Sequence, residues 1–309
     1  MSPERVTVTV EDRTLTLSNL DKVLYPATGF TKGEVIDYYT RIAPVMLPYI
    51  ESRPLTLKRY PDGVDGKSFF EKNAPSHTPD WIPKVRLPTP GSTKDRDTID
   101  FVVAHELPTV VWAANLAALE LHVPMWRVGP RGKVFNPDVL VFDLDPGAPA
   151  SIVECCEVAL LLRERLQADG LSAYPKTSGS KGMQLYVPLD AKSPWEDVHG
   201  YAKLLARDLT ESHKDLVVWQ MKKDLRGGKV LVDWSQNNSA KTTVAVYSLR
   251  AREAPTVSTP ISWEEVEGCD RPEQLRFTAP EVLDRVTHLG DLFTAVLDGS
   301  GSIPAGAGE

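Results

Sequence analysis

The sequence predicts an α+β fold whose second half follows the ferredoxin-like order β-α-β-β-α-β. Apolar residues alternate with other residues over 139–144, which is typical of a strand with one buried face. The capping patterns SIVE at 151–154 and SPWE at 193–196 each indicate the beginning of a helix. A last apolar run, KVLVDW at 229–234, supplies the fourth strand, which this order places beside the first strand.

The first part of the chain predicts an N-terminal α/β lobe over residues 1–125. TKGE at 31–34 is a capping-box pattern before an apolar-periodic helix, and a second helix is expected over 108–120. The segment 60–100 is rich in proline and glycine and lacks periodicity, so we expect long loops there.

The remaining elements complete a second lobe, expected over 126–298 of a single domain. They are a helix from 151 to about Gly170, short strands near 171–176 and 183–189, and a helix from 194 to about 213. The sequence GSIPAGAGE closes a segment, 299–309, that predicts a flexible tail.

The amino-acid composition limits the classes of protein to which this chain can belong. Of 309 residues, 42% are apolar and 25% are charged, as in an ordinary globular enzyme. The three cysteines form no CxxC pair, which argues against a disulfide framework and a structural zinc site. No apolar run approaches the roughly 18 residues of a membrane span. We therefore expect a cytoplasmic protein with no membrane partner.

The net charge of −7 argues at first against a polyanionic partner. Residues 253–309 hold eleven acidic residues and three arginines, so the rest of the chain carries a charge of +1. Within 222–252, seven Lys and Arg stand against two Asp. Because binding to nucleic acid depends on local phosphate contacts, a nucleic-acid partner stays open.

Two carboxylates end the first strand of the predicted core. Asp143 and Asp145 share one strand face and repel each other unless a positive charge lies between them. Asp233, on the adjacent last strand, reaches the same site if the register allows it. Three such carboxylates suit Mg²⁺ or Mn²⁺, and two ions of this kind favour phosphoryl transfer. The plainer interpretation is a strand end with solvated acids.

Potential phosphate ligands surround these acids. The loop TSGSKG, with Ser178 and Lys181, offers backbone N–H groups, hydroxyls and an ammonium, although it lacks the spacing of a Walker A loop. A plain hairpin turn is the alternative. Further candidates for neutralising phosphate are Arg226, Gln236, Lys241 and Arg250. By itself, His122 is more typical of a buried structural histidine.

Cations and aromatic residues also gather in the first lobe. Lys58 and Arg59 precede Phe69 and Phe70, a combination that suits base stacking over a phosphate track. We expect at least one of the two phenylalanines to lie in the core. Lys22 and Lys32 flank a turn near a helix N-terminus, which suits a terminal phosphate.

Taken together, these segments resemble the polymerase domain of bacterial DNA ligase D, within the archaeo-eukaryotic primase superfamily. The matching segments run in order between about residues 14 and 255: DKVLYPATG, RPLTLKRYPDG, FFEK, ALELHVPMW, LVFDLDPG, TSGSKG, VLVDWSQN and TTVAVYSLRAR. Because no ligase or nuclease segment accompanies them, the resemblance implies a stand-alone relative of the kind found in mycobacteria and other actinobacteria.

The resemblance implies a primase-polymerase fold with an RRM-like catalytic core at 126–298, and template and 5′-phosphate contacts in the lobe at 1–125. It implies template-dependent addition of nucleotides, with ribonucleotides favoured, to primer 3′ ends at gaps or breaks during DNA repair and non-homologous end joining. The implied cofactor is a two-metal site with Mn²⁺ or Mg²⁺. The implied partners are gapped or broken DNA with a 5′-phosphate, ribo- or deoxynucleoside triphosphates, a separate DNA ligase and end-binding repair proteins, in a nucleoid-associated setting.

The resemblance also assigns roles to single residues of this sequence. The implied metal ligands are Asp143, Asp145 and Asp233. The implied nucleotide-binding residues are Lys58, His122, Ser178, Lys181, Gln184, Arg226, Gln236 and Arg250. The implied DNA-binding residues are Asn19, Lys22, Lys32, Phe69 and Phe70.

One position departs from the family pattern. Six residues after the motif serine the family usually has His, whereas this chain has Gln184. Glutamine can donate a neutral N–H to phosphate but carries no charge, so we expect weaker triphosphate binding or an altered nucleotide choice. Two alternatives stay open: a phosphatase of the haloacid-dehalogenase type, whose first motif is also Asp-x-Asp, and a non-catalytic DNA-end-binding module.

Overall fold

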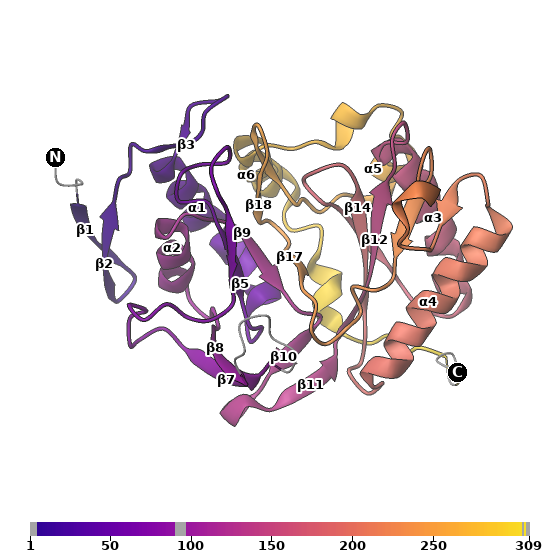
Figure 1. The fold of residues 1–309 in the computed structure, drawn as a ribbon, viewed down its shortest axis with the longest axis horizontal. Coiled ribbons are helices and arrows are strands. Elements are labelled where there is room, and N and C mark those ends of the chain that lie inside the picture. The colour runs from indigo at the N-terminus through magenta and orange to yellow at the C-terminus, as the bar shows by residue number, and fades with distance from the viewer. Residues whose placement is uncertain (1–4, 90–96, 305, 307–309) are drawn as a thin grey trace.

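The computed structural model describes residues 5–89, 97–304 and 306. A five-stranded sheet forms the second half of the molecule, in the order β13-β14-β12-β16-β15 (Figure 1). Its elements are β12 (Val139–Pro146), α3 (Ile152–Ala168), β13 (Tyr174–Thr177), β14 (Met183–Pro188), α4 (Trp195–Ser212), β15 (Val217–Val218), η2 (Lys223–Leu225) and β16 (Val230–Asp233). This confirms the ferredoxin-like order, with the short strand β15 added at the edge, parallel to β16.

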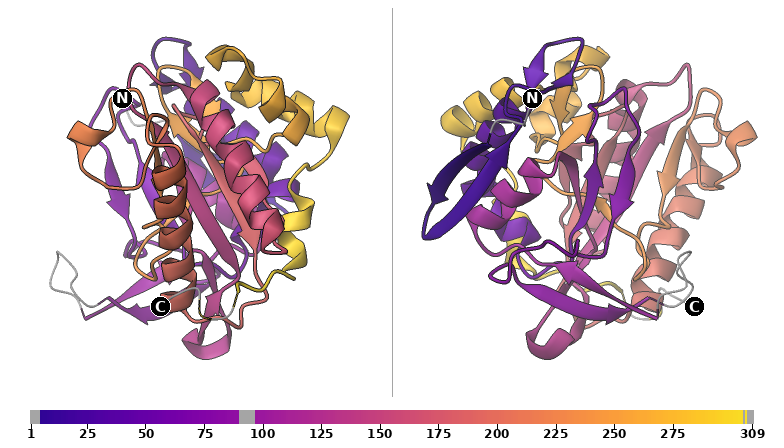
Figure 2. Two further views of the ribbon diagram at one scale, coloured as in Figure 1. Left: turned by 90° about the vertical axis from the view of Figure 1, so that its right-hand side faces the viewer. Right: turned by 60° about the vertical axis from the view of Figure 1, so that its left-hand side comes forward.

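The two helices of this half cover one face of the sheet, as Figures 1 and 2 show. Leu140, Phe142 and Leu144 of β12 are buried in a cluster shared with α3 and α4. The helix α3 begins with the expected capping box of Ser151 and Glu154. In contrast, α4 begins after Pro194, without a side-chain cap. The other face of β12 turns toward the first lobe.

The first lobe is built on a four-stranded sheet in the order β17-β9-β5-β6. Its N-terminal elements are β1 (Arg5–Val10), β2 (Arg13–Ser18), β3 (Val23–Tyr25), β4 (Phe30–Thr31), α1 (Lys32–Ile50), β5 (Thr56–Arg59), β6 (Phe69–Glu71), β7 (Lys84–Pro88), β8 (Thr98–Val102), α2 (Leu107–Asn115) and β9 (Ala118–Val123). The connecting elements are β10 (Trp126–Val128), η1 (Pro130–Gly132) and β11 (Val134–Pro137). The predicted capping box of α1 is confirmed at Thr31 and Glu34.

The C-terminal part of the chain returns to the first lobe. It contains β17 (Thr243–Val244), β18 (Leu249–Ala251), β19 (Pro255–Val257), α5 (Trp263–Glu267), η3 (Pro272–Leu275), α6 (Ala279–Leu289) and η4 (Thr294–Asp298). Strand β17 pairs with β9, and Val282 of α6 joins the same buried cluster as α1. The two lobes therefore share the C-terminal segment, and their division at residue 125 stays a prediction.

Two expectations for the first lobe are wrong. The helix expected over 108–120 ends at Asn115, because Ala117 takes a positive φ of 56° and the alternating run that follows forms β9. The segment 60–100 contains β6, β7 and the start of β8 rather than loops alone. Residues 90–96 of that segment lie outside the described residues.

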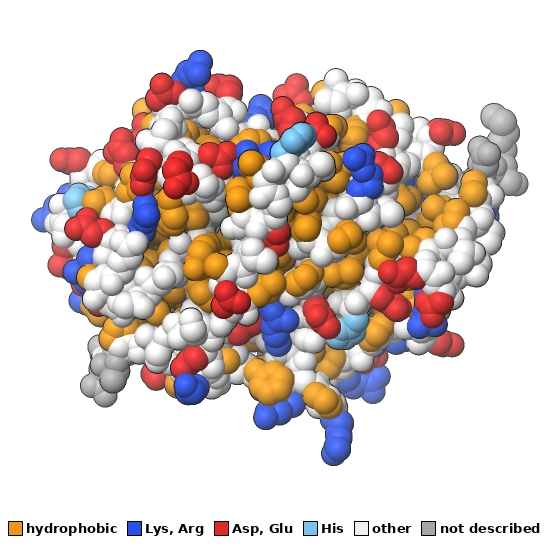
Figure 3. Space-filling model, turned by 180° about the vertical axis from the view of Figure 1, so that it is seen from behind, with side chains coloured by type: hydrophobic (Ala, Val, Ile, Leu, Met, Phe, Trp, Pro, Cys, Tyr) orange, Lys and Arg blue, Asp and Glu red, His pale blue; other side chains and the backbone are white. Residues whose placement is uncertain are grey.

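Where it is described, the chain end also differs from the expected tail over 299–309; residues 305 and 307–309 lie outside the described residues. Gly301 forms a bridge with Leu189, and Ile303 is buried in the cluster of the second half. Within the described ranges, no helix is both long and apolar enough to cross a membrane. On the face seen in Figure 3, acidic and basic side chains are interspersed with apolar ones. Local groups of charges, rather than the net charge, therefore locate the candidate site.

Candidate active site

Three carboxylates share one face of the ferredoxin-like sheet. In the antiparallel ladder between β12 and β16, Asp143 lies directly opposite Asp233, and Asp145 follows two residues later on the same face. The register that the sequence left open therefore brings the acids of the two strands together. These side chains face away from the helices α3 and α4.

Neutral groups donate hydrogen bonds to two of these carboxylates. Gln184 Nε2 donates to Asp143 Oδ1 at 3.1 Å. Asp233 Oδ1 accepts hydrogen bonds from the backbone N–H (2.9 Å) and the hydroxyl (2.6 Å) of Ser235, and Gln236 Nε2 donates to its Oδ2 at 3.2 Å. In the part of the chain that the structure describes, no group of three His, Cys or acidic side chains is closed into an arrangement that holds a metal ion.

The electrostatics of the acids fit a divalent cation. Burial, together with the charges of Asp145 and Asp233, raises the pKa of Asp143 to about 7. Burial and the charge of Asp233 also raise the pKa of Asp145, while Arg226 and Arg250 oppose this rise. Three oxygen-donor side chains that repel one another are the donor set that Mg²⁺ and Mn²⁺ favour.

A row of polar side chains crosses the sheet behind the acids. Lys176 of β13 pairs in register with Gln184 of β14, and Gln184 pairs with Asp143. Lys176 is fully buried, and its Nζ donates to Val244 O at 3.2 Å and to Ser258 Oγ at 2.5 Å. Burial lowers the pKa of Lys176 well below its usual range. This lysine was not predicted from the sequence. The only sequence feature that indicates it is its inward-facing position on a short strand.

The loop TSGSKG is held by its own serine. Ser178 Oγ accepts hydrogen bonds from Ser180 N at 3.2 Å and from Gly182 N at 3.3 Å. A Cβ on Gly182 would lie 1.9 Å from Leu144 O, which explains the glycine at this position. The loop therefore packs directly against β12, while Lys181 is exposed.

The glycine of DLDPG lets the loop around Arg226 approach the end of β12. A Cβ on Gly147 would lie 1.9 Å from Arg226 O, and Gly147 N donates to Lys229 O at 2.8 Å. The guanidinium of Arg226 donates to Met221 O at 2.5 Å, and its buried Nε has no hydrogen-bond partner. This arrangement places Arg226 within electrostatic reach of Asp145.

Asn237 continues the ladder where β16 ends. Its Oδ1 accepts a hydrogen bond from Val141 N at 2.8 Å, and its Nδ2 donates to Val141 O at 2.7 Å. The same Nδ2 donates to Trp234 O at 2.9 Å. Because the Asn237 side chain makes these ladder hydrogen bonds, the backbone after Asp233 leaves the sheet in a turn. Ser235, which donates hydrogen bonds to Asp233, lies in this turn.

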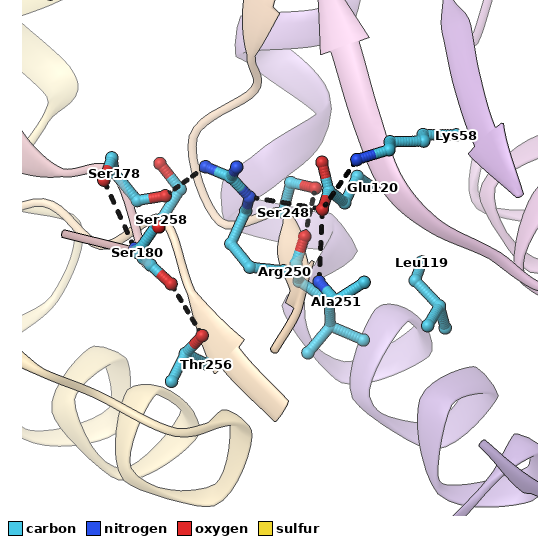
Figure 4. A network of polar contacts seen from close by, with 12 residues as sticks. Lys58, Leu119, Glu120, Ser178, Ser180, Ser248, Arg250, Ala251, Thr256 and Ser258 are labelled. Carbon is cyan, nitrogen blue, oxygen red and sulfur yellow. Dashed lines mark hydrogen bonds and ion pairs between the residues drawn. The ribbon is translucent and has the colours of Figure 1, made fainter. Parts of the chain in front are cut away.

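A second polar cluster lies on the first-lobe sheet (Figure 4). It joins Lys58 of β5, His122 of β9 and Arg250 of β18 to one buried carboxylate, Glu120. His122, expected to be a buried structural histidine, is only partly buried; it lies on a strand and pairs with this acid at 3.0 Å. Arg250 also donates through Nη1 to Ser178 O at 2.5 Å, which connects the cluster to the phosphate-loop candidate.

Both phenylalanines of FFEK lie outside the core, so the expectation that one is buried is wrong. Phe69 and Phe70 are 44% and 55% exposed. They stand on β6, the edge strand of the first-lobe sheet. Arg59 lies 5.2 Å from the Phe69 ring centre, and Lys58 Nζ lies 5.4 Å from that of Phe70.

The remaining predicted residues form a separate group near the start of α1. Asn19 and Lys22 line a surface depression, and Lys22 Nζ lies 3.0 Å from Asp62 Oδ1. Lys32 Nζ donates to Ser18 O at 2.6 Å. Burial, followed by the charges of Lys22 and Arg59, lowers the pKa of Lys32 to about 8.

An acidic site on a ferredoxin-like sheet, with cationic side chains of both lobes near it, is typical of enzymes that bind nucleotides and phosphates. Comparison with known proteins narrows this class. The family described as "LigD, primase-polymerase domain" matches residues 31–293. The chain therefore belongs to the LigD primase-polymerase family, whose members are DNA-directed nucleotidyltransferases.

Individual relatives agree with this membership. The chain is 44% identical to the multifunctional non-homologous end joining protein LigD of Mycolicibacterium smegmatis, over 93% of this chain and 36% of that protein. It is 31% identical to the bifunctional LigD of Bacillus subtilis, over 89% of this chain and 43% of that protein. The solved polymerase domain of Mycobacterium tuberculosis ligase D in complex with DNA matches with a TM-score of 0.85 and 42% identity, over 93% of this chain and 99% of that one. The chain thus spans less than half the length of these two LigD proteins.

Proposed function

We propose that this protein is a template-dependent nucleotidyltransferase that extends primer 3′ ends at gaps or breaks in DNA, in repair by non-homologous end joining. The observation that carries the proposal is the register of β12 and β16, which sets Asp143 opposite Asp233 with Asp145 beside them. Support also comes from the likeness to a polymerase domain solved with DNA. We further propose that ribonucleotides are the preferred substrates and that a separate ligase seals the product.

Asp143, Asp145 and Asp233 are the residues that would hold Mn²⁺ or Mg²⁺. When bound, such ions supply Lewis-acid stabilisation of the attacking and leaving oxygens of phosphoryl transfer. The protein's own groups prepare this site. Gln184 and Ser235 hold two of the carboxylates, through hydrogen bonds of 3.1 Å and of 2.6 to 2.9 Å.

Cations on both lobes would bind the incoming triphosphate. The proposed nucleotide-binding residues are Lys58, His122, Ser178, Lys181, Gln184, Arg226, Gln236 and Arg250. Exposed Phe69 and Phe70 would stack on template or base pair, and each has a cation over its ring to pair with phosphate.

Asn19, Lys22 and Lys32 would bind the 5′-phosphate at the downstream edge of a gap. Asn19 and Lys22 line a surface depression, and Lys32 at the start of α1 is buried with its ammonium on Ser18 O. A helix N-terminus with two ammonium groups favours a phosphate dianion.

The fold argues against the phosphatase alternative but does not distinguish the polymerase from a non-catalytic end-binding module. A haloacid-dehalogenase phosphatase needs a doubly wound parallel sheet, whereas β12 pairs antiparallel with both of its neighbours. A non-catalytic end-binding module has the same fold as the polymerase and differs only in turnover.

The test is extension of a labelled primer on a short-gapped duplex with a downstream 5′-phosphate. Each ribo- and deoxynucleotide is supplied with Mn²⁺ or with Mg²⁺, and Asp143→Ala is the control. We expect template-directed extension that the substitution abolishes. Tight binding to the gap without extension under either metal would identify the end-binding module instead.

A further inference from the structure

We propose that Glu120 is a positioning residue that orients Lys58, His122 and Arg250 toward the phosphates of the incoming nucleotide. The inference rests on the proposed function, because those three residues are among its proposed nucleotide-binding residues. Glu120 itself contacts no substrate in this arrangement. It acts through the side chains that it holds.

The backbone places Glu120 at the centre of the cluster. In the ladder between β5 and β9, Lys58 lies directly opposite Glu120, and His122 follows two residues later on the same strand face. Arg250 comes from β18, which lies against β9. Figure 4 shows Lys58 and Arg250 converging on the Glu120 carboxylate from different elements.

Both oxygens of the carboxylate are engaged. Oε1 lies 3.7 Å from Lys58 Nζ and 3.5 Å from Arg250 Nε, and it accepts a hydrogen bond from Ala251 N at 3.2 Å. Oε2 lies 3.0 Å from His122 Nε2. The carboxylate therefore has few acceptor sites left for a ligand, and its contacts hold the side chains of Lys58, His122 and Arg250 in place.

The Glu120 carboxylate is more deeply buried than the three side chains that it contacts. The Glu120 side chain is 3% exposed, whereas those of Lys58, His122 and Arg250 are 24%, 13% and 14% exposed. A ligand approaching this surface meets the positive groups first. The buried anion keeps cations that repel one another within a single patch.

The charges of the cluster depend on one another. Burial raises the pKa of Glu120, but the hydrogen bond with His122 and the charges of Arg250, His122 and Lys58 outweigh burial and hold this pKa well below its usual range. For His122, burial lowers the pKa, Glu120 raises it, and Arg250 and Lys58 lower it. Loss of the Glu120 charge therefore lowers the pKa of His122 further.

The cluster also connects the two lobes. Arg250 Nη1 donates to Ser178 O at 2.5 Å, and the buried Arg250 Nε has no hydrogen bond, so its ion pair with Glu120 is its polar contact there. Displacement of the guanidinium would release the carbonyl of Ser178 as well. Glu120 thereby influences a loop on the other lobe that it does not touch.

Glu120→Gln separates positioning from simple neutralisation. If Glu120 only cancelled positive charge, its removal would strengthen the attraction for a triphosphate and lower the KM for nucleotide. If it positions the cations, the variant lets them move apart, and KM rises. We expect the KM for nucleotide to rise at least tenfold in primer extension, with a smaller change in kcat.

Asp138→Asn is the matched control. Asp138 is another shielded carboxylate with two cationic partners, Arg53 at 2.7 Å and Arg127 at 2.8 Å, but it has no proposed role in binding. We expect it to lower the Tm while leaving the KM for nucleotide unchanged. Glu120→Asp keeps the charge but withdraws the carboxylate by one methylene, so it should fold and show an intermediate KM.

A second readout is the NMR titration of the His122 imidazole, assigned with His122→Gln. We expect its pKa to fall in Glu120→Gln, because the anion that stabilises the imidazolium is gone. An unchanged or lower KM, or an unchanged His122 titration, would overturn the positioning role. If wild-type protein neither extends primers nor binds nucleotide, the proposed function fails; the histidine titration still shows whether Glu120 controls the cluster.

Discussion

Replacing Asp143 by asparagine should make the metal-free protein more stable while abolishing its activity. The pKa of Asp143 is raised to about 7 by burial and by the neighbouring carboxylates. Above pH 7 the folded protein must therefore hold a charge that the unfolded chain accommodates freely. Asparagine keeps an oxygen that accepts the hydrogen bond from Gln184, but it carries no charge.

The sign and the magnitude follow from this raised pKa. Near pH 4 the folded carboxyl is protonated, so the substitution changes the free energy of unfolding little. As the pH rises from 3.8 toward about 7, the wild-type protein loses stability that the variant retains. A full difference of this size corresponds to about 4 kcal/mol. Structural relaxation around the partly exposed acids reduces it, so we expect about 2–4 kcal/mol at pH 8.

The assay is urea unfolding of both proteins in EDTA at pH 5, 6, 7 and 8, followed by circular dichroism. The difference in free energy of unfolding should grow with pH in favour of Asp143→Asn. Adding Mn²⁺ should narrow this difference, because the ion stabilises only the protein that binds it. A difference that is the same at all four pH values, or a less stable variant at pH 8, would refute the reasoning.

Three further predictions address other parts of the site. Gln184→His adds a group that can carry a positive charge and should lower the KM for nucleotide about tenfold, or about 1.4 kcal/mol; unchanged nucleotide kinetics would contradict it. Gly147→Ala should abolish primer extension because its methyl group would lie 1.9 Å from Arg226 O, whereas Gly227→Ala, with nothing within 4 Å, should retain extension. Preference for a downstream 5′-phosphate should weaken between pH 7 and 9, because the pKa of Lys32 is about 8. The test measures the affinity for gapped DNA with and without the phosphate, in the wild-type protein and in Lys32→Arg. The variant's preference should stay constant with pH, and a preference that still changes with pH would count against the prediction.

The ferredoxin-like half could be predicted because each of its elements carries a local signal. Ser151 begins α3 with a capping box, and the apolar alternation of β12 gives both its type and its buried face. Since the order of elements limits the sheet to few arrangements, the closeness of Asp143 and Asp233 followed from topology. Only the register needed the structure.

The predictions were wrong where tertiary contacts determine the local structure. The segment 108–120 reads as one apolar helix, but Ala117 breaks it, and the sheet of the first lobe recruits the rest as β9. The exposure of Phe69 and Phe70 depends on which elements pack over the two faces of the edge strand β6, and no local pattern encodes that packing.

Buried charges were the hardest features to anticipate. Lys176 and Glu120 are among the most deeply buried charged residues of the described chain, yet in the sequence each is one charge among many. Their partners come from distant segments, such as Ser258 for Lys176 and Arg250 for Glu120. A charged residue at an inward position of a strand is the only signal that the sequence offers.

The side chain of Asn237 limits how the chain after β16 can change in length. The Asn237 amide makes the two hydrogen bonds to Val141 that a residue of a neighbouring strand would otherwise make. The number of residues between Asp233 and Asn237 is therefore fixed. Inserting one residue between them would detach either the acid from its place opposite Asp143 or the amide from Val141. An insertion in this short stretch should therefore disturb the acidic site, although the site's acids themselves are unchanged.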